Sequence, residues 1–200
     1  MKRMKKSLPA ATALILMILI VNSSIAYFTS KDKAGNVYTV GSVDIKIDEP
    51  SWDPGEDHPI EPGKEHDKDP VVTNTGNNDA YVRIRLCISD YSAFIKHGGN
   101  DYDITSMFNI GSKWVKTGGP VIDSEDDTVR FTYTYTEVLP VGKVTEPLFT
   151  KVTMPDFIDS DMIRDMDNEF DVTVQADAIQ ADGFSNYTEA FKAFDERMGG

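Results

Sequence analysis

The chain has 200 residues, 40% hydrophobic and 26% charged, a composition that allows one domain with a real core and excludes an intrinsically disordered chain. Its 20 Lys and Arg residues against 33 Asp and Glu give a formal net charge of −13, which disfavours nucleic acid as a partner. The single cysteine, Cys87, excludes an internal disulfide, and its place in an apolar strand predicts a buried, unreactive thiol.

The first 26 residues have the pattern of a secretory signal peptide. Basic residues 1–7 precede an apolar run over residues 8–21, and Ser24 and Ala26 supply the small side chains that precede a cleavage site. The apolar run is shorter than the ~20 residues that a membrane-spanning helix needs. We therefore expect an N-terminal signal-peptide helix, transiently in the membrane, cleavage between Ala26 and Tyr27, and a single domain over residues 27–200. An uncleaved anchor is the alternative.

The first half of this domain predicts short strands. Residues 37–40 and 43–47 have strand patterns, and the second alternates with Val43, Ile45 and Ile47 on one face. Residues 49–70 contain five prolines and predict a loop. Residues 71–73 predict a strand, and residues 80–88 the strongest one. Its two faces carry Val82, Ile84, Leu86 and Ile88 on one side, and Tyr81, Arg83 and Arg85 on a side that is wet or partnered.

The second half continues the pattern. Residues 103–108 predict a helical turn, residues 117–127 a loop, and residues 156–169 a short helix or an acidic loop. Further strands are predicted over residues 128–139, 146–155 and 170–180. The tail predicts the one convincing helix. Its capping pair is Asn186 and Glu189, and its apolar face carries Tyr187, Ala190, Phe191 and Phe194.

These elements predict an all-β fold. About seven short strands separated by turn residues are typical of a two-sheet sandwich of jelly-roll or immunoglobulin-like type, here with a few short helices. No internal repeat and no long linker divides residues 27–200.

No catalytic constellation stands out, and we expect no cofactor. His58 and His66 lie among acidic residues and are weak zinc candidates, because no H-E-x-x-H spacing occurs. The acidic runs Asp123–Asp127 and Asp159–Glu169 offer oxygen ligands for weak calcium binding, but they lack the glycine and the distal glutamate of an EF-hand loop. A solvated acidic surface is the simpler interpretation of both.

Several blocks occur together in a distinctive order. "AYF" at Ala26–Phe28 ends the signal, followed by "SKD" at Ser30–Asp32 and "VGSVDIKI" at Val40–Ile47. "EPGKEHDKDPVVTNTGNNDAYVRI" at Glu61–Ile84 and "VTVQADAIQADGF" at Val172–Phe184 complete the series. In this order, behind this signal, they resemble the TasA/camelysin family of Gram-positive bacteria over most of the mature chain.

The resemblance implies a jelly-roll domain at the cell surface or in the extracellular matrix, after cleavage by a dedicated signal peptidase of the endoplasmic-reticulum type. In the biofilm members it also implies fibres, in which the freed N-terminal segment adds as a strand to the next subunit. A head-to-tail contact of this kind does not close and generates a filament. The candidate donor residues are Tyr27, Phe28, Val37, Tyr38 and Val40. Alternatively, this segment pairs within its own domain.

The function expected from these features is that of a secreted structural protein, a homo-oligomeric subunit of biofilm-matrix fibres. The first alternative is a camelysin-like cell-surface metalloendopeptidase, for which the resemblance but no residue of this chain provides support. The second is a monomeric cell-surface accessory protein exported by the same route.

Overall fold

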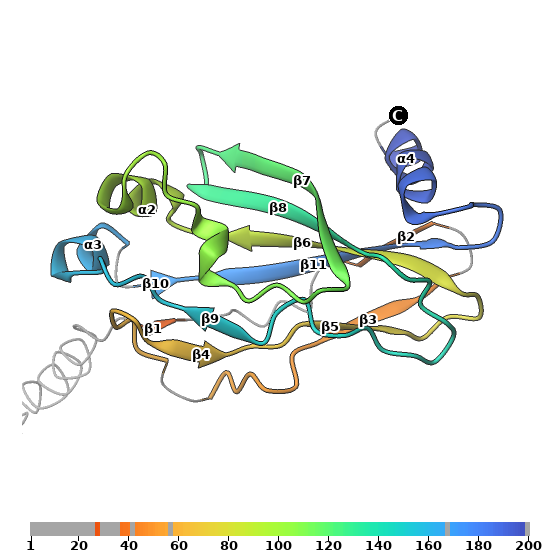
Figure 1. Cartoon of the computed structure of the whole chain (residues 1–200), viewed down its shortest axis with the longest axis horizontal. Helices are drawn as coiled ribbons and strands as arrows, with labels where there is room; N and C mark the ends of the chain where they lie inside the picture. Colours follow the sequence, from red (N-terminus) through yellow and green to blue (C-terminus); the bar gives the residue numbers. More distant parts are fainter. Residues whose placement is uncertain (1–26, 29–36, 41–42, 56–57, 167–168, 199–200) are drawn as a thin grey trace, which may run out of the picture.

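The structure is a computed structural model, and it describes residues 27–28, 37–40, 43–55, 58–166 and 169–198. Within these ranges the chain is mostly β-sheet with a few short helices (Figure 1). The expected signal peptide and Ala26 lie outside the described residues, so the leader helix and its cleavage stay predictions. None of the described helices is long and apolar enough to cross a membrane.

Five strands form the largest sheet, here called the main sheet. Their spatial order is β2 (Val37–Val40), β11 (Val172–Gln180), β6 (Ala80–Ile88), β8 (Thr128–Tyr135) and β7 (Trp114–Asp123). The pairs β11–β6, β6–β8 and β8–β7 are antiparallel, whereas β2 runs parallel to β11. β2 and β7 are therefore the two edges of the main sheet.

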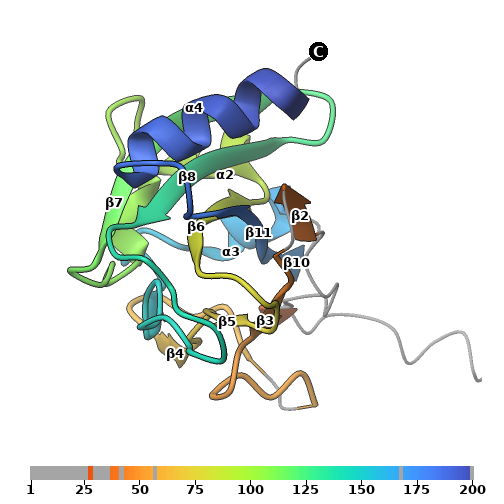
Figure 2. The ribbon, with the colours of Figure 1, turned by 90° about the vertical axis from the view of Figure 1, so that its right-hand side faces the viewer.

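The remaining strands form three short ladders. β3 (Ile45–Asp48) pairs with β5 (Val71–Asn74), β4 (Glu65–Asp67) with β9 (Lys151–Thr153), and β1 (Tyr27–Phe28) with β10 (Glu169–Phe170). The β3–β5 and β4–β9 ladders lie beneath the main sheet as a second layer (Figures 1 and 2). The sheets are not closed into one another, an arrangement consistent with the expected all-β sandwich.

The hydrophobic core lies between these layers, as the strand alternation predicted. The inward residues of β6, from Val82 to Ile88, are fully buried, and so are Val172, Ala176 and Ala178 of β11. From the second layer, Val43, Ile45, Val72 and Val152 belong to the same cluster. Strand alternation thus produces one apolar face per strand, and burying these faces against each other holds the layers together.

The described residues also form four short helices: α2 (Tyr91–Gly98), the 3-10 helix η1 (Ile104–Met107), α3 (Ser160–Asp165) and α4 (Tyr187–Met198). The tail helix α4 lies across the outer face of the main sheet (Figure 2). Its buried Ala190, Phe191 and Phe194 pack with Tyr81 and Ile179 in a second, smaller cluster. Asn186 accepts from the backbone of Glu189, and the Glu189 carboxylate accepts from that of Ser185, which confirms the predicted start of the helix.

Some expectations were wrong. The loop predicted over residues 117–127 is mostly strand, because β7 continues to Asp123. Two shifts in its register with β8 accommodate the glycines and Pro120. The predicted loop over residues 49–70 contains β4, and the strand predicted over residues 146–155 is limited to β9. Cys87 is half-buried, because it alternates onto the outer face of β6 with Arg83 and Arg85.

Helix α2 was not predicted, and its first turn shows why. Its N-cap, Asp90, makes no capping hydrogen bond with its side chain. Instead, the carboxylate of Asp127 accepts from the backbone N–H of Ser92 at 3.0 Å and from its hydroxyl at 2.6 Å. The cap thus comes from 35 residues along the chain, where no local pattern can reveal it.

Candidate functional site

The two edges of the main sheet differ in how accessible they are to another chain. An unpaired edge strand presents backbone N–H and C=O groups that can pair with a further strand. β7 forms one edge of the main sheet and β2 the other. Comparing them identifies the edge that could take part in assembly.

The β7 edge is irregular. Its pairing with β8 shifts register between Lys116 and Gly118 and again between Gly118 and Val121. Pro120, between these points, has no N–H to donate to a neighbouring strand. Two apolar side chains on this edge, Val121 and Ile122, are 51% and 52% exposed. Because these side chains are not polar, it is the irregular backbone that keeps another strand from pairing here. Bulges and proline are devices by which natural sheets avoid adding another strand.

The opposite edge is occupied by the N-terminal arm, here defined as residues 27–40, whose described parts are β1 and β2. Tyr27 and Phe28 pair in parallel with Glu169 and Phe170 of β10. Residues 37–40 pair in parallel with residues 176–179 of β11. The two described parts of the arm therefore pair with two successive strands of the same chain, β10 and β11.

The structure thus brings all five candidate donor residues, Tyr27, Phe28, Val37, Tyr38 and Val40, to strands along β10 and β11 of their own chain. This is the intrachain pairing that the sequence left open as an alternative. The arm nevertheless has an outer place: β2 ends the strand order of the main sheet, and no strand of the described residues lies beyond it. The polar middle of the arm, residues 29–36, lies outside the described residues.

The strand that receives the arm is thoroughly buried. Ala176, Asp177, Ala178 and Ile179, the register partners of β2, are at most 1% exposed. If the arm left, one side of the backbone of these four residues and part of their buried surface would be exposed to water. The arm of another subunit, which has the same sequence, could form the same backbone hydrogen bonds with β11 and cover the same surface.

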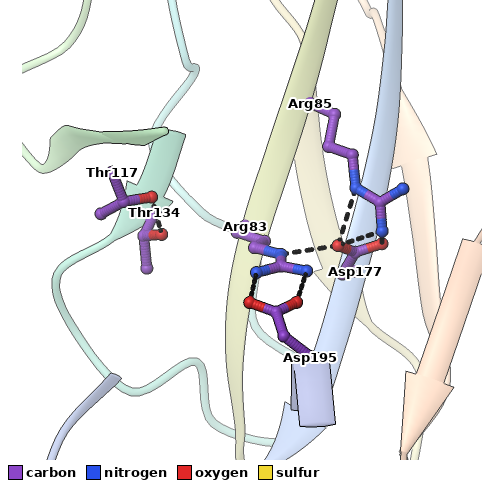
Figure 3. A network of polar contacts seen from close by, with 6 residues as sticks. All are labelled: Arg83, Arg85, Thr117, Thr134, Asp177 and Asp195. Carbon is purple, nitrogen blue, oxygen red and sulfur yellow. Dashed lines mark hydrogen bonds and ion pairs between the residues drawn. The ribbon is translucent and has the colours of Figure 1, made fainter. Parts of the chain in front are cut away.

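A polar network fixes this receiving strand from the outer face (Figure 3). Asp177, which is fully buried, accepts from Arg83 Nε at 2.6 Å and from Arg85 Nη2 at 2.6 Å. Arg83 also makes a two-pronged bond to Asp195 of α4, at 2.6 and 3.1 Å. Charge-assisted, bidentate bonds of this kind are among the stronger polar contacts in proteins.

The environment of Arg83 explains its charge state. Burial alone would lower its pKa, but the hydrogen bonds to Asp195 and Asp177 outweigh that effect and raise the pKa. The guanidinium also lies 4.6 Å from the ring centroid of Phe191 and 4.9 Å from that of Phe194. One arginine therefore joins β6, β11 and α4, next to the segment where Asp177 is the register partner of Tyr38.

Sequence reasoning found only part of this network. The sequence placed Arg83 and Arg85 on a face that is wet or partnered, but it assigned no partner to them and no role to Asp177. Nothing in the sequence linked them to Asp195, because that pairing spans 112 residues. An acidic residue in the middle of an apolar strand, opposite two arginines, was the available signal.

The two weak zinc candidates come together in the structure. The His58 ring stacks on Trp52 at 3.8 Å, and the His66 ring lies edge-on to it at 5.7 Å. His66 is buried, and burial, followed by the proximity of His58, lowers its pKa. Lys68, also fully buried, bonds to Glu49 at 2.6 Å and lies over Trp52. In the described part of the chain, no group of three or more His, Cys, Asp or Glu side chains is placed to hold a metal.

The acidic runs supply structural contacts. Asp123 accepts from the backbone of Glu125 in a turn, and Asp159 caps α3 by accepting from Asp161 and Met162. Asp165 bonds to Lys96 at 2.5 Å and to His97 at 2.7 Å, joining α3 to α2. The hydrogen bond with His97, followed by that with Lys96, lowers the pKa of Asp165. These carboxylates stabilise turns and helix ends.

Comparisons with protein-family models, with curated proteins and with solved structures found no match to the chain. Membership of the TasA/camelysin family is therefore a proposal based on the sequence blocks quoted above.

Proposed function

We propose that this protein is a secreted structural subunit of extracellular, biofilm-matrix fibres, related to the TasA/camelysin family, and that its sandwich is of the jelly-roll type. Signal-peptide removal after Ala26 frees the arm, which leaves its own β10–β11 edge and pairs with the same edge of another subunit. Each subunit then gives one arm and receives one, so the contact does not close and a filament grows.

The observation that carries this proposal is the difference between the two edges. The arm occupies the regular edge of the main sheet by parallel pairing, while register shifts and Pro120 make the β7 edge unsuitable for another strand. Exchange of an identical strand needs no new interface chemistry, because the same backbone bonds and the same strip on β11 are used.

The charge of the chain adds a condition. Four of the 20 basic residues lie in residues 1–6 and no acidic residue lies in residues 1–26, so residues 27–200 carry 16 positive and 33 negative charges, a net −17. Such subunits repel each other, and assembly has to overcome that repulsion through a specific contact. The free arm supplies one.

The experiment compares residues 27–200 beginning at Tyr27 with the same protein carrying a short N-terminal extension, both imaged by electron microscopy. We expect filaments only from the free Tyr27 start. A protein that stays monomeric in both forms favours the accessory-protein alternative. Chelator-sensitive digestion of casein favours the metalloendopeptidase.

A further inference from the structure

A groove runs beside α4 on the outer face of the main sheet. It has a volume of about 620 Å³ and is lined by residues of β6, β7, β8 and α4. β7 and β8 contribute Thr117, Gly118, Thr132 and Thr134 to its lining, here called the floor, and α4 contributes the residues here called the wall. None of these residues lies on β10 or β11, the strands with which the arm pairs, although Arg83 bonds to Asp177 of β11.

The floor of the groove offers hydroxyl groups. The hydroxyls of Thr117 and Thr134 bond to each other at 2.8 Å, and Thr132 lines the groove beside them. A threonine hydroxyl has one donor and two acceptor sites. Thr134 is buried, whereas Thr117 is exposed and Thr132 is half-buried, so the hydroxyl groups that a polar ligand can reach are those of Thr117 and Thr132.

The wall adds a rigid fork and an aromatic surface. Arg83 donates three of its five N–H groups to Asp177 and Asp195, and its other two N–H groups are not used in these bonds. Stacking over Phe191 and Phe194 holds the guanidinium plane in place. Tyr187 lines the same wall and is half-buried. Planar, pre-arranged polar groups beside an aromatic ring suit a ligand that has hydroxyls at its rim and C–H groups on its faces.

The charges of the groove select the ligand further. Its lining holds two basic residues, Arg83 and Lys192, and two acidic ones, Asp195 and Glu196, so the groove itself carries no net charge and favours a neutral ligand. The net charge of the chain, −13, further disfavours phosphates, uronates and other anions. A purely apolar ligand would cover the threonine hydroxyls without bonding them, which is unfavourable. We propose that this groove binds a neutral oligosaccharide segment. This proposal is independent of the fibre proposal, since a monomer carries the complete groove.

The test uses the full chain in a mild detergent and four neutral probes: cellohexaose, maltohexaose, laminarihexaose and N-acetylchitohexaose. Each is titrated to about 10 mM and followed by isothermal calorimetry. We expect at least one probe to bind, and Thr132→Val, which keeps the side-chain shape and removes one hydroxyl, to weaken that binding about tenfold. Thr128→Val, on the same strand but outside the groove, is the matched control and should bind like the unchanged chain.

Three outcomes would overturn the proposal: no probe binds, Thr132→Val binds as tightly as the unchanged chain, or an anionic polyuronate hexamer binds better than every neutral probe. Threonine-to-valine changes suit a strand, so loss of folding is not expected to obscure the result. Circular dichroism of each variant checks this, and Asp195→Ala, in an exposed part of α4, provides a second variant of the same groove.

Discussion

Replacing Asp177 by asparagine tests the polar network that fixes the arm-receiving strand. The Asp177 side chain is 0% exposed, and those of Arg83 and Arg85 are only 11% and 24% exposed. Asparagine keeps the shape and one oxygen but removes the charge that both guanidinium groups share. Removing one partner of a buried ion pair costs about 3–5 kcal/mol, because the remaining charge is left uncompensated. We expect the lower end, about 3 kcal/mol, because Asp195 still neutralises Arg83.

The free energy of unfolding at pH 7, from urea titration of each variant, measures this effect. Asp195→Asn is the matched control: its side chain is 60% exposed, so it should cost about 1 kcal/mol or less. The denaturant slope should be the same for all variants, which shows that the unfolded state is unchanged. A loss below about 1 kcal/mol for Asp177→Asn would refute the role assigned to this carboxylate.

Three further predictions concern pH, the second edge and salt. Burial lowers the pKa of His66 below its ordinary 6.5, so as pH falls the unfolded chain binds a proton before the folded chain does, and the free energy of unfolding decreases below about pH 6.5. Urea titrations of the unchanged chain and of His66→Gln should show this decrease in the difference between their free energies of unfolding. An increase in that difference as pH falls would contradict the prediction. Pro120→Thr restores an N–H on β7 and should increase irregular aggregation in light scattering, whereas unchanged solubility would argue against protection of this edge. Raising salt from about 0.01 to 0.15 M shortens the Debye length from about 30 to 8 Å and should speed filament growth; slower growth would mean that attraction, not repulsion, dominates between subunits.

Local patterns in the sequence were sufficient for the central strands. Ala80–Ile88 was predicted to the residue, because its alternation is regular and each inward side chain is large and apolar. The tail helix could be predicted equally well, from the capping pair Asn186 and Glu189 and from its apolar face. In both elements the signal lies within one turn or one strand of the residues that it describes.

Other features depended on contacts between distant residues. Helix α2 begins on the carboxylate of Asp127, and β7 passes through a glycine-proline stretch because β8 pairs with it on either side. The Arg83–Asp177–Asp195 network joins three elements that only the fold brings together. The groove beside α4 depends on the same packing, so no motif could indicate it.

The arm also shows what strand propensity leaves undecided. Its sequence predicted strands, and β1 and β2 are strands, but propensity is the same whether the partner belongs to the same chain or to another one. Parallel pairing requires a long connection, which here runs through the whole domain between Val40 and Ala176. Only a measurement on assembled subunits distinguishes the two partners.

Cysteine cross-linking makes this measurement directly. Thr39 and Ala178 are register partners across β2 and β11, and neighbouring strands lie about 4.8 Å apart, within the Cα range of about 4.4–6.8 Å that a disulfide accepts. One subunit carries Thr39→Cys and the other Ala178→Cys, both with Cys87→Ser. Replacing Ala178→Cys by Val174→Cys, four residues out of register, provides the control.

If the arm is exchanged, filaments grown from the mixture should contain disulfide-linked dimers joining the two variants, and the Val174 control should give none. Filaments that form without any such dimer, while a single chain carrying both Thr39→Cys and Ala178→Cys closes its own disulfide, would show that every arm stays on its own subunit. Polymerisation by arm exchange would then be wrong.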